Sequence, residues 1–86
     1  MSDYIVSFKS SAAKELRKLP VELQQRIAKI IPKLIEDPRY SGVIKLKGND
    51  NLHRCRVGEY RIVYSIDDSQ RKVTVTRIRH RKDVYQ

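Results

Sequence analysis

The sequence has one cysteine, no tryptophan and roughly half as many carboxylates as basic side chains. Because Cys55 is the single cysteine, an internal disulfide and a cysteine-based metal site are excluded, and the sequence fits a reducing compartment. No segment approaches the ~18 apolar residues of a membrane span. The N-terminus, MSDYIVSF, lacks the basic and apolar regions of a signal peptide. We therefore expect a soluble cytoplasmic protein, with one modest core and a single domain over residues 1–86.

The residues of most common active sites are also missing. The sequence has no P-loop or other glycine-rich phosphate motif and no serine or cysteine nucleophile with a suitable partner. His53 and His80 lack the companion ligands that a zinc site needs. Asp67 and Asp68 are more typical of a hairpin turn than of a catalytic carboxylate pair. We therefore expect neither a metal nor another cofactor.

Positive charge is abundant instead. Nineteen Lys and Arg against ten Asp and Glu give a net charge of +9. A field of this sign favours polyanions, either nucleic acid or an acidic protein. The arginines concentrate in the second half of the chain, where few acids accompany them: Arg54, Arg56, Arg61, Arg77, Arg79 and Arg81.

The first half of the chain predicts one strand and two helices. Residues 4–8, YIVSF, are typical of a strand. We expect Ser10 or Ser11 to cap a helix that Pro20 stops or restarts. The next segment has an apolar stripe at i, i+3, i+4, i+7 and i+8, from Ile27 to Ile35. Pro32 lies inside this stripe and predicts a kink or break, and the helix should end near Asp37 and Pro38.

The second half has the two-residue period of strands. Residues 52–57, 60–66 and 72–78 are strand candidates, and 43–46 is a further short one. Short turns join antiparallel neighbours. The predicted fold is therefore α+β: a small, mostly antiparallel sheet with two N-terminal helices packed on one face. The two turns are expected at 58–59 and 67–71.

Strand alternation predicts where the arginines point. Arg54 and Arg56 share one face of their strand, opposite His53 and Cys55. On the last strand, strict alternation places Arg77, Arg79 and Arg81 on the same side as Val73 and Val75. Because helices should cover one face of the sheet, we expect the arginines to gather on the other face or at its edge.

Arginine, tyrosine and histidine together could cut RNA without a metal. A ribose 2′-OH would attack its neighbouring phosphate, arginines would stabilise the developing charge, and a further group would protonate the leaving oxygen. Tyrosine can stack on an exposed base. The same residues could equally just bind nucleic acid, so the residues by themselves leave both functions open.

The segment LHRCRVGEYRIVY (52–64), followed by RHRKDVY (79–85), resembles the RelE/ParE superfamily of bacterial toxins and is most similar to its RelE branch. SFKSSAAKELRKLP, the Asp-Pro after the long helix, and IKLKG (44–48) match the same family in the same order. The resemblance implies a βααβββ toxin of a type II toxin–antitoxin system. It also implies a metal-independent endoribonuclease that cleaves mRNA in the ribosomal A site. The implied partners are the 70S ribosome, mRNA and an antitoxin with an acidic, amphipathic segment.

The resemblance also implies residue roles. Arg61 and Arg81 would hold the scissile phosphate, and Tyr85 would stack on or position a nucleotide. RelE members often have lysines where this chain has Arg54 and Arg56, and an arginine is a poor acid or base near neutral pH. His80 is therefore our first candidate for that role and His53 the second, although the alternation also fits a core position for His53. The residues expected to bind RNA are Arg54, Arg56, Lys45, Lys47, Arg77 and Arg79.

Two other functions remain open at the level of sequence. A ParE-like protein would inhibit DNA gyrase by binding, without catalysis, and such proteins usually lack the full arginine and tyrosine set. A catalytically degenerate homologue would keep the basic face and bind RNA only.

The assignment of Arg81 generates a first prediction. Arg81→Ala should lose most of the RNA cleavage with little loss of stability, because the side chain should be an exposed charge. Cleavage assays beside thermal denaturation test this. A variant that unfolds, or one that cleaves normally, contradicts the assignment.

Overall fold

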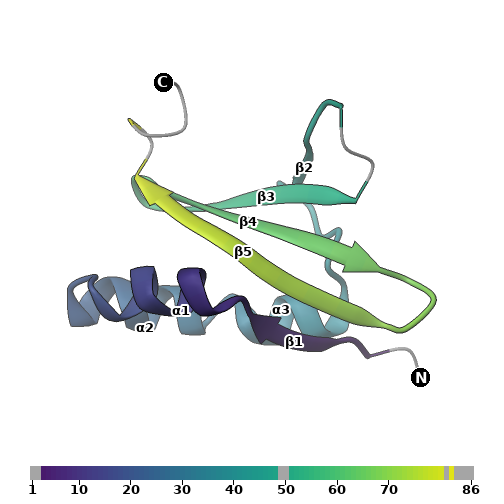
Figure 1. The fold of residues 1–86 in the computed structure, drawn as a ribbon, viewed down its shortest axis with the longest axis horizontal. Coiled ribbons are helices and arrows are strands. Elements are labelled where there is room, and N and C mark those ends of the chain that lie inside the picture. Colours follow the sequence, from purple (N-terminus) through teal and green to yellow (C-terminus); the bar gives the residue numbers. More distant parts are fainter. Residues whose placement is uncertain (1–2, 49–50, 81, 83–86) are drawn as a thin grey trace.

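A five-stranded sheet with helices across one face forms the protein (Figure 1), which confirms the predicted α+β class. The structure, a computed structural model, describes residues 3–48, 51–80 and 82. The strand order is β1-β5-β4-β3-β2. The strands are β1 (Ile5–Phe8), β2 (Ile44–Lys45), β3 (Leu52–Val57), β4 (Tyr60–Asp67) and β5 (Lys72–His80).

The sheet is mostly antiparallel, as predicted. β2, β3, β4 and β5 pair antiparallel with their neighbours, whereas β1 pairs parallel with β5. The two hairpin turns fall where the sequence placed them, at 58–59 and after Asp67. Gly58 has φ +59°, a conformation that glycine adopts at little cost, so the tight β3–β4 turn depends on it.

The helices are α1 (Ser10–Arg17), α2 (Val21–Ala28) and α3 (Ile31–Glu36). The break predicted at Pro32 is confirmed, because the long apolar stripe divides between α2 and α3. Pro32 lies in the first turn of α3, where its missing N–H costs no hydrogen bond. The predicted serine cap is wrong: Lys9 is the N-cap of α1 and makes no side-chain cap bond. No helix in the described residues is long and apolar enough to cross a membrane.

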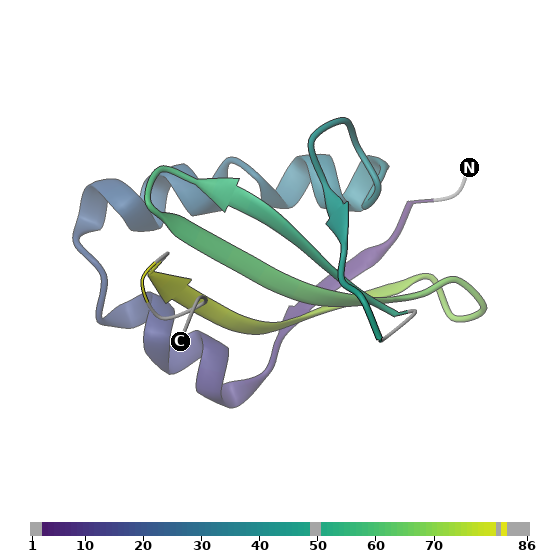
Figure 2. The same cartoon turned by 90° about the horizontal axis from the view of Figure 1, so that it is seen from above.

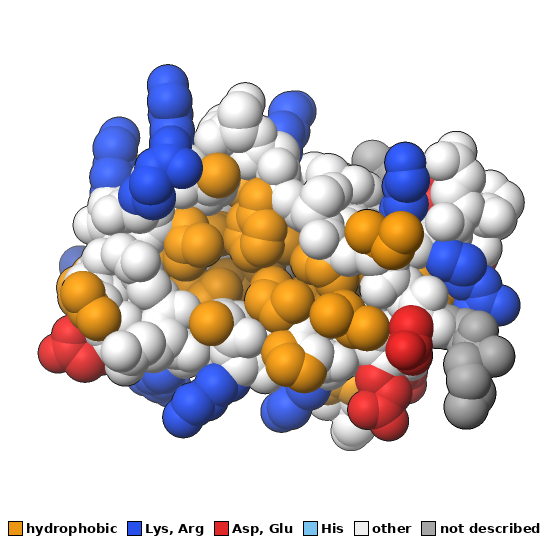
Figure 3. Space-filling model, turned by 90° about the horizontal axis from the view of Figure 1, so that it is seen from below, with side chains coloured by type: hydrophobic (Ala, Val, Ile, Leu, Met, Phe, Trp, Pro, Cys, Tyr) orange, Lys and Arg blue, Asp and Glu red, His pale blue; other side chains and the backbone are white. Residues whose placement is uncertain are grey.

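The core lies between the helices and the sheet. Ala12, Ile27 and Leu34 from the three helices pack against the strand side chains Ile62, Tyr64, Val73, Val75 and Ile78. Figure 3 shows the helix side of the molecule, with apolar side chains along its middle and charged ones around its rim. Tyr64 is fully buried, and its hydroxyl donates a 2.6 Å hydrogen bond to the Pro38 carbonyl. This bond ties the end of the helical layer to the central strand.

A β-bulge changes which residues of β5 face the core. Val63 lies opposite Arg77, but the next residue, Tyr64, lies opposite Val75, so Thr76 is an extra residue in β5. The Thr76 hydroxyl donates to the Val63 carbonyl at 3.2 Å. Strict alternation was therefore wrong for this strand. The buried residues are Val73, Val75 and Ile78, whereas Arg77 and Arg79 point to the face that the helices leave uncovered, here called the open face.

The buried tyrosine generates a stability prediction. Tyr64→Phe should lower the unfolding free energy by about 1–3 kcal/mol, because it leaves the Pro38 carbonyl without its partner in a buried setting. Thermal or urea denaturation measures the loss. The control is Tyr4→Phe, which removes an exposed bond to Asp68 that water can replace, so its cost should be smaller. Equal losses in the two variants would contradict this account.

Candidate nucleic-acid interface

The open face carries two rows of side chains that run across three strands. In the first row Arg56, Arg61 and Arg79 lie directly opposite one another on β3, β4 and β5. In the second row Val63 lies between Arg54 and Arg77. Neighbouring side chains on one face of a sheet are about 5 Å apart at Cβ. Five arginines thus share one small surface, which confirms that they gather on the face opposite the helices.

Arg61 lies at the centre of the first row and is only 3% exposed, whereas Arg56 at the end of that row is exposed. In the second row the Arg54 Nε is buried and has no hydrogen-bond partner among the described residues. A cation that little water screens attracts anions more strongly than an exposed one. The two rows thus concentrate guanidinium groups, which suit phosphate by their geometry, on one face of the sheet.

Glu15 of α1 is a functional candidate that sequence reasoning missed. Its Oε2 lies 2.7 Å from the Arg79 Nη1, and its Oε1 accepts a 3.2 Å hydrogen bond from the Ile78 N–H. The β1–β5 pairing ends at Phe8 and Val75, so Glu15 satisfies part of the β5 edge that β1 leaves open. This one carboxylate holds both the backbone of β5 and an arginine of the open face. The available signal in the sequence was that Glu15 is the one acidic residue within the otherwise basic and apolar segment KELRKL.

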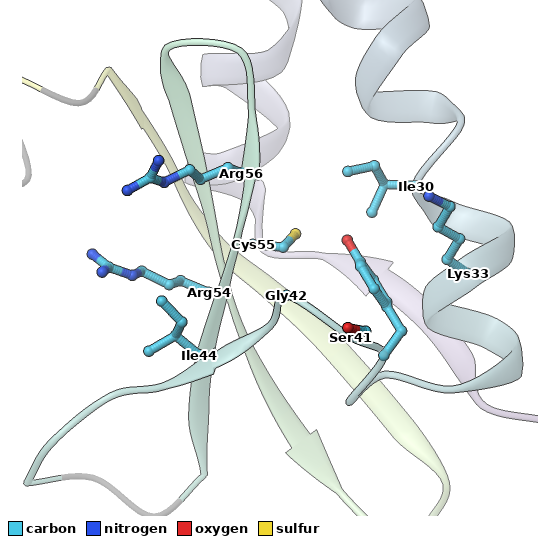
Figure 4. A pocket seen from close by; sticks show the side chains of 9 residues that line it. Ile30, Lys33, Ser41, Gly42, Ile44, Arg54, Cys55 and Arg56 are labelled. Carbon is cyan, nitrogen blue, oxygen red and sulfur yellow. The ribbon is translucent and has the colours of Figure 1, made fainter.

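The two faces of β3 differ sharply in chemistry. Figure 4 shows Arg54 and Arg56 on one side of the strand and Cys55 on the other, toward Ile30 and Lys33. These residues line a cavity of about 410 Å³ at the outer edge of β3. Cys55 is 2% exposed and burial raises the pKa of its thiol, so it is protonated at neutral pH. Cys55 is thus a small core residue, as the alternation suggested.

His53 also belongs to the core. It is 5% exposed, stacks on the Tyr64 ring with centroids 6.1 Å apart, and places Nδ1 3.3 Å from the Asn51 carbonyl oxygen. Burial lowers the pKa of His53, which therefore stays neutral at pH 7. It faces the helix side and does not reach the open face. The core interpretation of His53 is confirmed.

His80 lies opposite Tyr60 in the pairing of β4 with β5, and their rings meet edge to face at 5.2 Å. Its Nδ1 accepts a 3.2 Å hydrogen bond from the Lys82 N–H. Because Tyr60 and His80 are an opposed pair next to Arg61 and Arg79, they point to the face opposite those arginines. His80 is therefore adjacent to the arginines in sequence but separated from them by the sheet.

The remaining expected residues fall at the margins. Lys45 lies opposite His53, so its register places it on the other side from Arg54, and Lys47 is exposed in the turn after β2. Arg81 and Tyr85 lie outside the described residues. No group of three His, Cys, Asp or Glu that could hold a metal ion occurs within residues 3–48, 51–80 and 82.

Fold and surface together define a small α+β protein with a strongly basic sheet face. The chain belongs to the ParE toxin family of type II toxin–antitoxin systems: the model described as "ParE toxin of type II toxin-antitoxin system, parDE" matches residues 6–85. Within the RelE/ParE superfamily it falls in the RelE-like branch.

Its similarity to RelE proteins extends over the whole chain. It is 32% identical to Toxin RelE of Mycobacterium tuberculosis, over 99% of this chain and 92% of that protein. It is 30% identical to the mRNA interferase toxin RelE of Escherichia coli K12, over 95% and 90%. The archaeal RelE–RelB complex from Pyrococcus horikoshii contains a chain with TM-score 0.81 and 29% identity, over 94% of this chain and 97% of that one.

The first row of arginines generates a prediction about stability. Like charges directly opposite one another destabilise a sheet, so Arg56→Gln should raise the unfolding free energy by about 0.2–1 kcal/mol at low salt. The gain should shrink as salt screens the repulsion. Denaturation at two salt concentrations measures it, with Arg17→Gln on α1 as the control. A destabilised Arg56→Gln at low salt would show that the row is not repulsive.

Proposed function

We propose that the protein is a ribosome-dependent, metal-independent endoribonuclease that cleaves mRNA in the ribosomal A site and so inhibits translation. The observation that carries this proposal is the arginine row Arg56–Arg61–Arg79, with a nearly buried guanidinium at its centre. The names of relatives such as the mRNA interferase toxin of E. coli support the same activity.

In the proposed reaction the ribose 2′-OH attacks the adjacent phosphorus and the P–O5′ bond breaks. The products are a 2′,3′-cyclic phosphate and a new 5′-OH end. Negative charge grows on the phosphate oxygens in the transition state, and fixed guanidinium groups stabilise it there. Arg61 and Arg81 hold this phosphate, Tyr85 positions the neighbouring base, and Arg54, Arg56, Arg77 and Arg79 bind the strand on either side.

The reaction also needs a group that transfers protons. His80 is the histidine nearest to Arg81 in sequence, and its ring packs against Tyr60 on the far side of the sheet from Arg61. For His80 to act, its ring would have to reach around the end of β5. The arginines therefore contribute through charge stabilisation, and His80 takes part in proton transfer only if its ring leaves Tyr60.

The proposed partners follow from the same surface. The 70S ribosome presents mRNA to the open face, and an antitoxin with an acidic, amphipathic segment covers the basic surface and blocks it. RelE proteins occur in solved complexes with RelB antitoxins from several organisms, including P. horikoshii and M. tuberculosis. A protein with these proposed partners would act in the cytoplasm.

One observation favours a second function. The matching family model is described as a ParE toxin of the parDE system. A ParE-like protein would inhibit DNA gyrase by binding, which is the alternative that the sequence resemblance left open. The complete row of arginines favours the nuclease, because a gyrase inhibitor needs no preorganised phosphate site. A catalytically degenerate toxin homologue that only binds RNA would also keep this surface.

Mapping mRNA ends in a translating extract distinguishes these functions. Added wild-type protein should cut mRNA at A-site codons and leave a 5′-OH on the downstream fragment. Arg61→Lys should cut about 10–100-fold more slowly, because lysine keeps the charge but loses the planar fork. Lys29→Ala, at the C-cap of α2, is the matched surface control and should cut normally. Intact mRNA together with trapped gyrase–DNA complexes would establish the second function instead.

A further inference from the structure

A groove of about 740 Å³ runs beside the arginine rows, between α1 and the open face of the sheet. From above, α1 lies alongside the β5 side of the sheet and β2 lies at the other side (Figure 2). One wall is α1, the floor comes from β4 and β5, and Leu46 and Leu52 close the far side. We call this the α1 groove. Apart from Glu15, the side chains of its helical wall contact neither of the two arginine rows in any described interaction.

The α1 wall of the groove is basic because two lysines recur on the same face of the helix. Ser11, Lys14, Glu15 and Lys18 recur at i, i+3, i+4 and i+7, which places them on one face of the helix. The apolar side chains of the segment point elsewhere: Ala12 is fully buried in the core, and Leu16 and Leu19 pack against it. The sequence thus builds a helix with one face in the core and another on the groove.

The charge of the groove is strongly one-sided. Among the described residues five cations line it, three from α1 and its two caps and two from β5: Lys9, Lys14, Lys18, Arg77 and Arg79. Among the described residues of the lining Glu15 is the single acid, and its carboxylate is already engaged by Arg79 at 2.7 Å and by the Ile78 N–H at 3.2 Å. A polyanion entering the groove therefore meets an excess of cations and little repulsion.

The apolar part of the groove selects the kind of polyanion. Val63 in the floor and Leu46 and Leu52 at the far side give the groove an apolar region opposite the basic α1 wall. In a double helix the bases are paired and stacked, so only phosphates and sugars would face such a wall. In a single strand the bases can turn onto apolar or aromatic groups while the phosphates follow the cations. The observations therefore favour single-stranded RNA.

The groove is also continuous with the proposed cleavage surface. Arg79 belongs both to the groove lining and to the row that contains Arg61, and Arg77 lies beside Val63 in the second row. We infer that the α1 groove is a second RNA-binding subsite. In it, Lys14 and Lys18 of α1 bind phosphates of a single strand whose neighbouring phosphate lies at the arginine rows. This inference rests on the proposed function for the identity of that strand.

A binding assay without cleavage tests the subsite. The probe is a labelled oligouridine of about ten nucleotides with 2′-O-methyl riboses, which cannot attack the phosphate. Its dissociation constant for the full chain is measured against salt. Each lost phosphate contact should reduce the salt slope by about 0.7 for a single strand. Lys14→Ala/Lys18→Ala should therefore bind several-fold more weakly, with a slope smaller by about 1.4.

The control removes the same charge from elsewhere. Arg17→Ala/Lys29→Ala also lowers the net charge by two, but neither residue lines the groove. It should keep nearly the wild-type slope, and thermal denaturation should show both double variants folded. Equal slopes in the two variants would overturn the inference, and so would a blunt-ended duplex that binds as tightly as the single strand with the same dependence on Lys14 and Lys18.

Two further outcomes separate the alternatives. If an acidic helical peptide requires Lys14 and Lys18 while the RNA probe does not, the groove is a protein-binding site and the inference is wrong. If the RNA probe requires both lysines but the wild-type protein leaves mRNA intact in translating extracts, the subsite stands and the nuclease proposal fails. If a Lys14→Ala/Lys18→Ala variant binds the probe with wild-type affinity and cleaves mRNA normally, the nuclease proposal stands and the subsite inference fails.

Discussion

The extra residue in β5 is the constraint on which the rest of the surface depends. Without the bulge at Thr76, a strand that buries Val73 and Val75 would also turn Arg77 and Arg79 toward the core, where unpaired charges are very costly. With it, the same nine-residue strand changes sides once. Its first half completes the core, its second half contributes two arginines to the open face, and Ile78 returns to the core between them. One bulge thus puts the valines of the first half of β5 and the arginines of its second half on opposite faces of the sheet.

The cost of that surface is visible in its neighbours. Three arginines side by side repel one another across β3, β4 and β5, and the core beneath them must offset this repulsion. Tyr64, fully buried and bonded to the Pro38 carbonyl, lies at the centre of that core. At the β5 end of the row the carboxylate of Glu15 neutralises part of the charge of Arg79.

The far corner of the molecule is held by a different set of polar contacts. There Asp68 joins the Arg39 guanidinium and the Tyr4 hydroxyl, and the hydrogen bond from Arg39 is the main reason that the pKa of Asp68 falls to about 2.

Much of the fold could be predicted from the sequence, because the period of the apolar residues and the positions of proline and glycine determine it locally. The strand at 52–57 alternates in burial, the strand predicted at 60–66 has apolar side chains at every second position besides Val63, and Pro20 and Pro32 mark the starts of α2 and α3. The bulge could not be predicted, since Thr76 differs in no obvious way from Thr74 and its role arises only when β5 pairs with β4. Glu15 was missed for the same reason: its partners, Ile78 and Arg79, are more than sixty residues away in sequence. The sequence predicted that the arginines gather on one face of the sheet. Their arrangement in two rows follows only from the register between the strands.

The register between the strands also determines which chemical groups lie on the open face. A phosphodiester cleavage needs both charge stabilisation and proton transfer, and the sheet supplies these groups unequally. The guanidinium groups stand on the open face, whereas both histidines point to the helix side, where His53 is stacked on Tyr64 and His80 packs against Tyr60. A thiol with a raised pKa in the core adds nothing on the open side. If the face cleaves RNA, most of its rate enhancement must come from holding the phosphate in a fixed field of positive charge. The proton must then move through water, the RNA itself or the residues beyond the end of β5. In such a site the placement of Arg61 between Arg56 and Arg79 matters more than the pKa of any single group.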